Sequence, residues 1–537
     1  MERTPDEPGP RSADKSGSES FGVLNSVRRD TYADSVALMR AARQLTDLPG
    51  VESASLVMAT GANLRQLADA GLLTDAGRDA RPNDLIVAVH GEPDTLTAAV
   101  DAVAGLLDRP DEESGGGDGG GADAPAPRAL TEADPATVLA LISTPGAYAG
   151  AEALKALRRG MHAFVFSDNV PLAQEVAVKR EARARGLLAM GPDCGTALLD
   201  GIPLGFTNAL RPGRTGLIGA SGTGLQQVSC LLDAHGEGIR QMIGTGGRDL
   251  SSEVGGITTL DAFELLDADP GCALIVLVSK PPAPEVAERV LERAARSAKP
   301  VVACFLDGTA PYATDGLTVV GTLRDAAYAA VRLLGGTPPE RFAWPRPAPP
   351  SGHLLRALYA GGTFAYEARL LLPAAVTETG AATGTGAATP HSAEVTLPDR
   401  HLILDLGDDA YTAGRPHPMI DPTVRAAHLR AALRDPRTAV IVLDVVLGHG
   451  AGTDPVGPLA AELERAPRRS RPVVVAFGVG TDRDPQGAAE QLARLRQAGV
   501  LLAPTSTDAA EFAVSLLPAR AERTRVEGDL TPAGGHA

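Results

Sequence analysis

The chain has 537 residues, of which 44% are hydrophobic, and its formal net charge is −16. A chain of this length is expected to form about three or four domains, each with its own core. The excess of acidic residues argues against a nucleic-acid-binding surface, and the sequence contains no basic run that would provide one locally. No apolar run reaches the ~20 residues of a membrane span. The polar N-terminus lacks the apolar core of a secretory signal, so we expect a cytoplasmic protein without membrane partners.

The four cysteines lie in or beside apolar runs and lack CxxC spacing, so we expect reduced and mostly buried thiols. They are Cys194, Cys230, Cys272 and Cys304. Cys194 belongs to GPDCGTAL (191–198), where the neighbouring glycines would expose a reactive thiol. A reactive thiol needs a positive charge or a base beside it. The local sequence offers neither, so an inert Cys194 is favoured, and no metal site is predicted.

The N-terminal part of the chain is predicted to fold as a small domain. Residues 1–19 are polar and expected to be disordered, and the Gly-rich residues 109–129 are expected to be a flexible linker. Between them, residues 20–108 alternate strand-like and helix-like segments, which predicts a small α+β module of ferredoxin-like type. Strands are expected near 21–27, 51–58 and 84–90, and helices near 31–46, 61–71 and 94–107. Nothing in the module indicates catalysis.

The segment 130–200 has the strand–helix alternation of a Rossmann-like domain. Its strands, near 138–144, 162–168 and 187–190, are continuous apolar runs, which is typical of a parallel sheet covered on both faces. Ligands bind such sheets at the carboxyl ends of the strands. The candidate CoA- or nucleotide-binding residues at these ends are Ser143, Pro145, Asp168 and Asn169. Ordinary loop and capping chemistry explains them equally well, and their spacing is not the GxGxxG of nicotinamide binding.

GLIGASGTGLQQ (216–227) is the most informative motif of the chain. A strand ends at Ile218, the glycines allow a sharp turn, and apolar residues then recur at helical spacing. A helix that starts beside bare N–H groups binds anions, because its dipole end is positive and its first donors lack partners. The motif therefore predicts a site for a phosphate, a carboxylate or an oxyanion at Ser221, Gly222, Thr223 and Gly224. A plain tight turn is the alternative. Position 223 is Thr, so the GxSxG elbow of a hydrolase is poorly supported.

A second glycine turn, GTGGRDL (244–250), follows in the same predicted domain, 201–335. Gly246 and Gly247 make the turn permissive, and Arg248 offers a planar fork suited to a carboxylate or a phosphate. Arg248 and Asp249 are therefore candidate catalytic residues. The structural alternative is that Asp249 and Glu253 only form salt bridges with Arg248.

A linker with a short helix is predicted at 336–398, then a second strand–helix domain at 399–520 and a tail at 521–537. The loop 405–421 gathers charged residues that Pro416 and Pro418 hold stiff, which favours a fixed recognition surface. These residues are Asp405, Asp408, Asp409, Arg415, His417 and Asp421. In the GHG segment after the next strand, His449 is a candidate base or phosphoryl acceptor and Gly448 and Gly450 are candidate anion-binding positions. A lone loop histidine more often has neither role.

These motifs resemble the FdrA family, within the superfamily of succinyl-CoA ligases and NDP-forming acyl-CoA synthetases. The likeness covers about residues 20–518. The matching segments are GPDCGTA (191–197), GASGTG (219–224), GGRDLSSEVGG (246–256), SKPP (279–282), GGTFAYEA (361–368), DLGDDAYTAGRPHPMIDP (405–422) and DVVLGHGA (444–451). The resemblance implies an α/β chain with a Rossmann-like CoA-binding domain and two flavodoxin-like ligase domains. One chain would thus unite two helix N-termini that the ligases supply from separate subunits, the second expected at Gly448–Thr453.

Three departures from the ligase pattern bear on the chemistry. Ligases carry a phosphorylatable histidine in a GHAGA loop, and the corresponding segment here, GTAPYATDGLTVV (308–320), has none. The ligase glutamate that steadies that histidine is replaced by Gln227. No ATP-grasp-like domain lies between the two halves. A free phosphate or a substrate phosphate is therefore expected at the helix ends in place of a phosphohistidine.

The resemblance implies an enzyme subunit that transfers an acyl or carbamoyl group with phosphate. Such an oxamate carbamoyltransferase of allantoin breakdown converts oxalurate and phosphate into oxamate and carbamoyl phosphate. Ser221–Gly224 would cradle the phosphate, Arg248 would clamp the carboxylate, and amides near Gly246 and Gly247 would hold the oxyanion.

Two alternative activities remain open at this point. One is acyl-CoA ligation with CoA and a nucleotide, and the other is a non-catalytic CoA-sensing or scaffold role. The candidate cofactors are CoA and phosphate. The candidate partners are a small-molecule substrate and other subunits of the FdrA pathway, in a hetero-oligomer.

Overall fold

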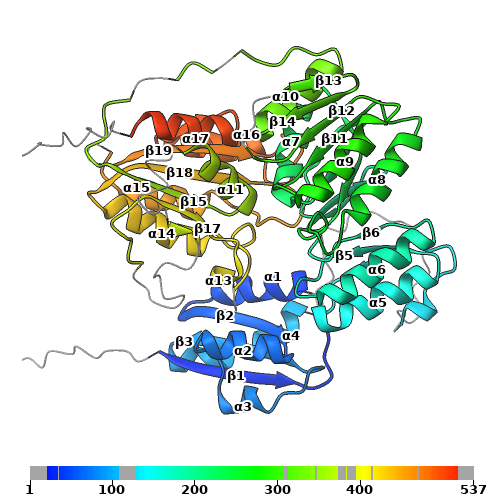
Figure 1. Cartoon of the computed structure of the whole chain (residues 1–537). Helices are drawn as coiled ribbons and strands as arrows, with labels where there is room; N and C mark the ends of the chain where they lie inside the picture. Colours follow the sequence, from blue (N-terminus) through cyan, green and yellow to red (C-terminus); the bar gives the residue numbers. More distant parts are fainter. Residues whose placement is uncertain are drawn as a thin grey trace, which may run out of the picture.

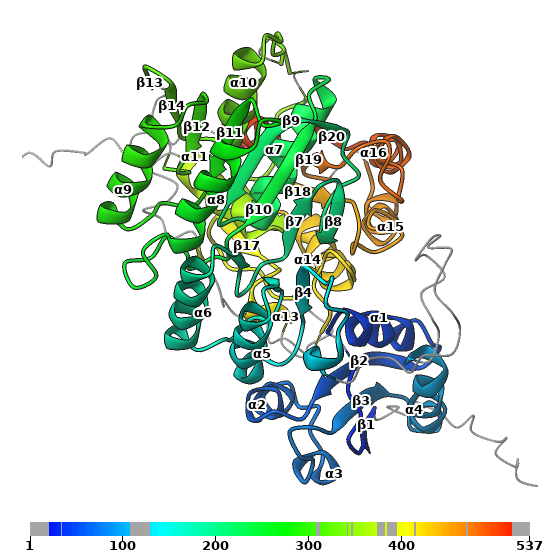
Figure 2. The same cartoon turned by 90° about the vertical axis from the view of Figure 1, so that its right-hand side faces the viewer.

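Four β-sheets organise the chain, and each belongs to a different part of the sequence (Figure 1, Figure 2). The computed structural model describes residues 21–33, 35–107, 129–307, 312–340, 342–344, 347–372, 382–383, 395–412, 415–468 and 471–517. The predicted disordered segment 1–19, the predicted tail 521–537 and almost all of the predicted linker 109–129 lie outside these residues.

The N-terminal module is a three-stranded antiparallel sheet in the order β1-β3-β2, with helices packed on it. Its core joins Leu45 of α1, Val87 of β3 and Val103 of α4. The elements are β1 (Gly22–Arg28), α1 (Ser35–Thr46), β2 (Val51–Met58), α2 (Gly61–Asp69), α3 (Asp75–Arg78), β3 (Leu85–Gly91) and α4 (Pro93–Leu107). The predicted small α+β module is confirmed, and the short α3 is an addition to it.

The next unit, β4 to β6, is a parallel three-stranded sheet in the order β4-β5-β6. Its helices pack on the sheet through small and branched apolar side chains such as Ala153, Ala156 and Val178. The elements are η1 (Leu130–Glu132), β4 (Leu139–Ile142), α5 (Gly146–Arg158), β5 (His162–Val165), α6 (Leu172–Ala184) and β6 (Ala189–Met190). The strand–helix alternation that the sequence predicts for this segment is present.

The largest sheet has eight strands in the order β13-β14-β12-β11-β9-β10-β7-β8. Its central strands are parallel and buried on both faces, as their continuous apolar runs predict. The elements are β7 (Thr196–Leu199), β8 (Ile202–Gly205), β9 (Pro212–Gly219), α7 (Gly222–Ala234), β10 (Ile239–Gly244), α8 (Ile257–Ala268), β11 (Leu274–Val278), α9 (Pro284–Ala295), β12 (Val301–Cys304), β13 (Tyr312–Thr314), β14 (Leu317–Val320) and α10 (Leu323–Leu333). Because β7 pairs with β10, the sheet starts a few residues before the predicted boundary at 200.

The C-terminal sheet has six parallel strands in the order β16-β17-β15-β18-β19-β20. The elements are β15 (Leu354–Tyr359), α11 (Gly362–Leu371), β16 (Ala382–Thr383), β17 (Leu402–Asp405), α13 (Asp409–Thr412), α14 (Thr423–Arg434), β18 (Thr438–Val446), α15 (Gly457–Arg465), β19 (Val473–Val479), α16 (Ala488–Gln497), β20 (Leu501–Ala503) and α17 (Ser506–Ser515).

One assignment from the sequence changes here. Residues 336–398 are predicted to be a linker with a short helix, but β15 pairs with β17 on one side and β18 on the other, and all its residues are buried. The short helix is α11, which follows β15 directly. The domain therefore starts near residue 352 and not at 399, because the apolar run of β15 is needed at the centre of its sheet.

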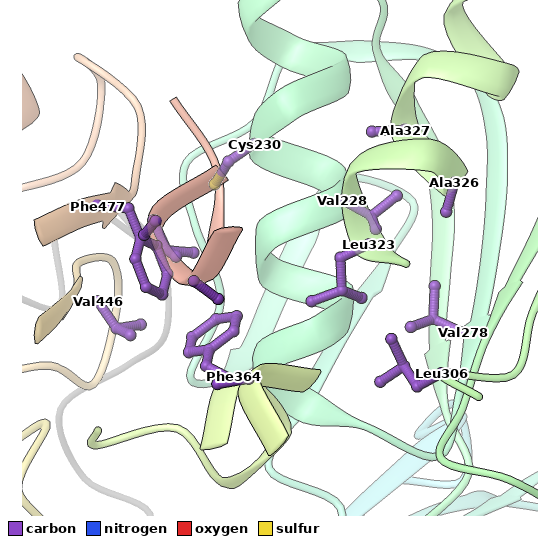
Figure 3. Close-up of a cluster of buried hydrophobic side chains, with 14 of the residues drawn as sticks. Val228, Cys230, Val278, Leu306, Leu323, Ala326, Ala327, Phe364, Val446 and Phe477 are labelled. Carbon is purple, nitrogen blue, oxygen red and sulfur yellow. The ribbon is translucent and has the colours of Figure 1, made fainter. Parts of the chain in front are cut away.

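The two larger sheets share one hydrophobic core. Helix α7 packs against α10 and α11, and α17 packs against the same two helices. Phe364 of α11 meets Phe477 of β19 edge to face with ring centroids 5.0 Å apart. Figure 3 shows apolar side chains of both halves converging on α7. Asn208 Nδ2 also donates to Asp484 Oδ2 at 2.8 Å across the same boundary. The starts of α7 and α11 are thus held in a fixed relation.

The N-terminal module docks on the other parts of the chain, as Figure 2 shows. Arg43 of α1 forms an ion pair with Asp421 at 3.1 Å and donates to Thr423 Oγ1 at 3.3 Å. Across the described residues, the helices are too short or too polar to span a membrane.

Candidate functional site

A cavity of about 780 Å³ lies where the N-terminal module, the β4–β6 unit and the two larger sheets meet. Its volume is typical of a small-molecule site. Nine of the residues that the sequence analysis offers as catalytic, anion-binding or CoA-binding candidates line it. They are Ser143, Pro145, Asp168, Asn169, Ser221, Gly222, Thr223, Gly246 and Gly247. The other candidates, Gly224, Arg248, Asp249, Gly448, His449 and Gly450, are not part of its lining.

The first helix N-terminus at this cavity is that of α7. Ser221 caps the helix, because its Oγ accepts from Gly224 N at 3.1 Å. The amides of Gly222 and Thr223, in the first turn, have no intrahelical acceptor. Glycine is required at 219, since a Cβ there would lie 2.6 Å from Leu225 of the helix. The sequence motif thus gives the turn, the cap and the helix-start amides on which the predicted anion site depends.

The second helix N-terminus at the cavity is that of α11. Gly362 and Thr363 line the cavity, and Thr363 Oγ1 lies 2.6 Å from Ser221 Oγ. The two helix starts, from different halves of the chain, therefore face one space. The signal for this site in the sequence is GGTF (361–364), which shares its central Gly-Thr pair with SGTG (221–224).

A buried carboxylate fixes the turn before α11. Asp444 accepts from Ala360 N and from Gly361 N, both at 2.9 Å. Arg425 Nη2 lies 2.8 Å from Asp444 Oδ1 and compensates its charge. The next two residues, Gly362 and Thr363, begin the helix and line the cavity.

The Gly448–Thr453 segment is a loop and not the start of a helix, because α15 begins only at Gly457. Gly448 N donates to Gln486 Oε1 at 3.0 Å, and His449 N donates to Thr207 O at 2.8 Å. The second helix end expected there is therefore supplied by α11. His449 and Gly450 line a neighbouring cavity of about 560 Å³, which shares Ser143 with the larger one.

Arg248 and Asp249 belong to a network of ion pairs whose other members, Glu175 and Lys179, are buried, whereas the Arg248 side chain is 47% exposed. Arg248 Nη2 lies 2.8 Å from Glu175 Oε2 and donates to Val170 O at 2.7 Å. Asp249 is fully buried and accepts from Lys179 Nζ at 2.7 Å and from Thr259 N at 2.9 Å. The salt bridges expected from Asp249 and Glu253 to Arg248 are not present among the described residues. Arg248 pairs instead with Glu175 and Asp249 with Lys179, both on α6.

The loops after β4 and β5 form another wall of the cavity. A Cβ at Gly146 would lie 2.1 Å from Asp168 O, so only glycine lets these two loops touch. Asn169 adopts a left-handed φ of 53° beside them. Gly246, with φ 84°, approaches Pro192 O in the same way. Ser143, Pro145, Asp168 and Asn169 are consequently brought to the space that α7 and α11 face.

Two cationic side chains that the sequence analysis did not assign to an anion site also line the cavity, Lys280 after β11 and Arg415 after α13. Lys280 Nζ lies 5.7 Å from the ring centroid of Tyr366. Neither forms an ion pair within 4 Å with any residue that the structure describes. On a chain with a net charge of −16, cations without an ion-pair partner on the wall that two helix N-termini also line give the cavity a local positive field that would attract an anion.

His417 contributes a neutral imidazole to the cavity. Burial, with Arg425 nearby, lowers the pKa of His417 to about 4, so the ring carries no charge at neutral pH. Met419 N donates to His417 Nδ1 at 3.2 Å, which assigns the ring proton to Nε2. The ring also contacts Phe206, with centroids 6.1 Å apart.

Gln227 faces away from the cavity, toward α17. Ser506 Oγ lies 2.7 Å from the amide oxygen position of Gln227 and also contacts Glu367 of α11. A hydroxyl has one proton, and Gln227 Nε2 is buried without a partner among the described residues. The amide is therefore best turned so that Nε2 donates to Ser506 Oγ. Gln227 and Glu367, equally far along α7 and α11, are tied to each other through Ser506.

The cysteines are inert in this structure. All four are buried and unpaired, as the sequence predicts. Cys194 borders the cavity, but burial raises the pKa of its thiol to about 12. The nucleophilic thiolate is therefore not populated at neutral pH.

Asp405 ends β17 beside the start of α11, and its pKa is raised by burial to about 6. The hydrogen bond from Gly407 N at 3.0 Å and the charge of Lys280 act in the opposite direction. Asp408 and Asp444 add to the rise. A Cβ at Gly362 would lie 2.3 Å from Asp405 Oδ2, so this carboxyl group touches the start of α11.

Asp405→Asn is expected to raise the free energy of unfolding, relative to the unmodified chain, more at pH 8 than at pH 4. The raised pKa means that the fold disfavours the charged carboxylate; this cost is absent below about pH 4 and complete above about pH 6. The free energy of unfolding, measured by urea denaturation of both proteins across this range, should therefore diverge between pH 4 and 6. Asp399→Asn, at an exposed position, should show no such divergence. A constant difference for Asp405→Asn across the range would contradict the assignment.

Three family models match the chain. They are AllF, heavy metal-associated domain, over residues 22–125; CoA binding domain over residues 211–306; and CoA-ligase over residues 358–516. The CoA-binding match covers the sheet from β9 onward and lies after the 130–200 segment that the sequence analysis linked to CoA. The fold and these domains define an α/β protein of the acyl-CoA synthetase-like superfamily, as predicted.

The chain belongs to the family of YahF from Escherichia coli (strain K12), to which it is 38% identical over 504 residues, covering 90% of this chain and 96% of YahF. It is 27% identical over 179 residues to the mitochondrial succinate–CoA ligase [ADP-forming] subunit alpha-2 of Trichomonas vaginalis, covering 32% of this chain and 57% of that subunit. A solved structure, the dinucleotide-forming acetyl-coenzyme A synthetase 1 of Ca. Korarchaeum cryptofilum in complex with phosphate and ADP, is 14% identical with a TM-score of 0.32, covering 72% of this chain and 84% of that chain.

The matched segment 22–125 contains no cysteine, the ligand that soft heavy metals prefer. The described residues contain no cluster of three or more His, Cys, Asp or Glu suited to a metal ion. Residues of β2 and α2 form part of the cavity wall, with Thr60, Asn63 and Arg65 among the lining residues.

Proposed function

We propose that the chain transfers an acyl or carbamoyl group to or from phosphate in the 780 Å³ cavity. The observation that carries this proposal is the meeting of two helix N-termini, where Ser221 Oγ lies 2.6 Å from Thr363 Oγ1. Both helix starts favour a phosphate by their free amides and their dipoles, and Lys280 adds a charge beside them. Preorganised donors of this kind stabilise the oxyanion that develops during acyl transfer.

The preferred reaction is that of an oxamate carbamoyltransferase. A phosphate oxygen attacks the terminal carbamoyl carbon of oxalurate, and the bond from this carbon to the inner nitrogen breaks. The proton of the attacking hydrogen phosphate passes to that nitrogen, so oxamate leaves with an NH2 group and carbamoyl phosphate remains. No covalent bond to the protein is needed, which fits the lack of histidine in residues 308–320. Other subunits of the same pathway are the proposed partners.

Acyl-CoA ligation is the second candidate, because the chain matches CoA-binding and CoA-ligase family models. When bound, CoA would supply the thiol that accepts the acyl group. Ser143, Pro145, Asp168 and Asn169 would hold it, since these loops open on both cavities and leave room for an extended ligand.

Two parallel assays separate these candidates. The purified full chain, alone and with the proteins of neighbouring genes, is tested for carbamoyl phosphate formed from oxalurate and phosphate, and for thioester formed from a carboxylic acid, ATP and CoA. Product in the first assay supports the proposal. Product only in the second replaces it with ligation, and no product in either leaves the scaffold or CoA-sensing role.

Gly222→Pro is expected to raise the KM for phosphate roughly 10- to 100-fold, because it deletes one amide donor to a charged ligand. Proline suits the first helical position, and the preceding Ser221 is already extended. The KM is measured by steady-state kinetics of the active assay. Gly222→Ala is the matched control, since it adds a Cβ near Thr196 Oγ1 but keeps the amide. Equal KM values for the two variants would remove α7 from the phosphate site.

A further inference from the structure

Arg415 is a largely buried arginine whose charge has no partner in the described structure. Its Nε is buried without a hydrogen-bond acceptor, and no described carboxylate lies within 4 Å of the guanidinium. Burial lowers the pKa of Arg415, and Asp421 and Glu52 only oppose this from a distance. Asp421 is itself paired with Arg43 at 3.1 Å. A buried charge without a partner is costly, so this guanidinium is positioned for an anion that is not part of the chain.

The segment that carries Arg415 is stiff. Pro416 and Pro418 fix the backbone on both sides of His417. Arg415 N donates to Thr412 O at 2.9 Å, and Ile420 N donates to His417 O at 2.8 Å. Arg415 and His417 both line the 780 Å³ cavity, so one rigid segment presents both side chains to it.

His417 stands next to the start of α11. A Cβ at Gly407 would lie 2.5 Å from His417 Nε2 and 2.6 Å from Ala360 O, just before α11 begins. Glycine at 407 thus leaves Nε2 room. This nitrogen carries the ring proton, and no described residue accepts from it. The segment therefore offers a charged fork and a neutral donor beside the proposed phosphate site.

We propose that Arg415 and His417 recognise the organic substrate, Arg415 by binding its carboxylate and His417 by donating from Nε2 to a neighbouring carbonyl oxygen. The substrate class is a small carboxylate with a carbonyl group on the adjoining carbon. This inference rests on the proposed function, in which the helix ends take the phosphate. It gives the carboxylate clamp to Arg415 in place of Arg248, whose guanidinium is held by Glu175.

Oxamate and oxamide form a matched pair of probes, since the amide of oxamide replaces the carboxylate of oxamate. In calorimetric titrations of the full chain, oxamate is expected to bind roughly 10- to 100-fold more tightly than oxamide. Arg415→Met should abolish this preference, and Arg415→Lys should restore only part of it, because lysine lacks the planar fork. His417→Phe, which keeps a ring against Phe206, should weaken oxamate binding by roughly 2- to 10-fold.

Three controls make the test specific. Inorganic phosphate should bind Arg415→Met as it binds the unmodified chain, and the urea midpoint of Arg415→Met should be equal or higher, because an unpaired buried charge is removed. Arg65→Met, at an exposed arginine of the same cavity, should keep the preference for oxamate. The proposal is overturned if the unmodified chain does not distinguish the two probes, if Arg415→Met still prefers oxamate, or if Arg65→Met alone loses the preference. Oxamate binding that needs Arg415 without formation of carbamoyl phosphate would reject the proposed function but keep this site.

Discussion

Lys179→Met is expected to lower the free energy of unfolding by about 3–5 kcal/mol, as measured for broken buried ion pairs. The Lys179 side chain is fully buried, with Nζ 2.7 Å from Asp249 Oδ1 and 3.2 Å from Glu175 Oε1. Asp249 in turn accepts from Thr258 N and Thr259 N at the start of α8. Removing the ammonium leaves two carboxylates in the interior, only one of which retains an arginine partner. Urea denaturation of the full chain measures the loss.

Lys155→Met is the matched control for this prediction. Lys155 lies on α5 and pairs with Glu152 at 2.6 Å, but its side chain is 59% exposed. Exposed pairs of this kind contribute about 0–1 kcal/mol, so the control should unfold close to the unmodified chain. If Lys179→Met and Lys155→Met lose the same stability, the network around Asp249 does not hold the β4–β6 unit to the largest sheet.

This network explains why the Arg248–Asp249 motif is hard to interpret from the sequence. An arginine and an aspartate after a glycine turn suit a ligand clamp and a structural ion pair equally well. The decisive partners, Glu175 and Lys179, lie far away in the sequence and meet the turn only after α6 packs beside α8. The local sequence pattern predicts the glycine turn, but the role of Arg248 and Asp249 depends on which residues tertiary packing brings beside them.

The starts of α7 and α11 also show that local sequence signals predict a turn and a helix but not the sheet to which they belong. GASGTG predicts its turn, cap and helix because all the signals are local. GGTF carries similar signals, but it lies between proline-rich and glycine-rich stretches that favour a linker, so β15 and α11 are not predicted as part of a sheet. Their place becomes evident only when β17 and β18 flank β15. Likewise, the prolines around His417 predict a stiff surface but not which cavity it faces.

Asp444→Ala is expected to destabilise the protein by about 3–5 kcal/mol. The substitution leaves the guanidinium of Arg425 buried without its carboxylate and deprives Ala360 N and Gly361 N of their acceptor. Because those amides set the turn into α11, phosphate affinity should fall as well. Urea denaturation measures the first effect, and calorimetric titration with inorganic phosphate, under conditions where the variant is folded, measures the second.

Asp454→Ala separates the effect of burial from the loss of the contacts themselves. Asp454 also accepts from an amide at a helix start, Gly457 N at 2.9 Å, and pairs with Arg494 at 2.6 Å, but its side chain is 50% exposed. Its removal should cost about 1 kcal/mol, the usual value of a lost cap, and should leave phosphate affinity unchanged. An Asp444→Ala protein that is destabilised but binds phosphate normally would show that the start of α11 does not depend on this carboxylate. The convergence of α7 and α11 would then be a consequence of core packing around Phe364 and Phe477, and the buried Asp444–Arg425 pair would serve stability alone.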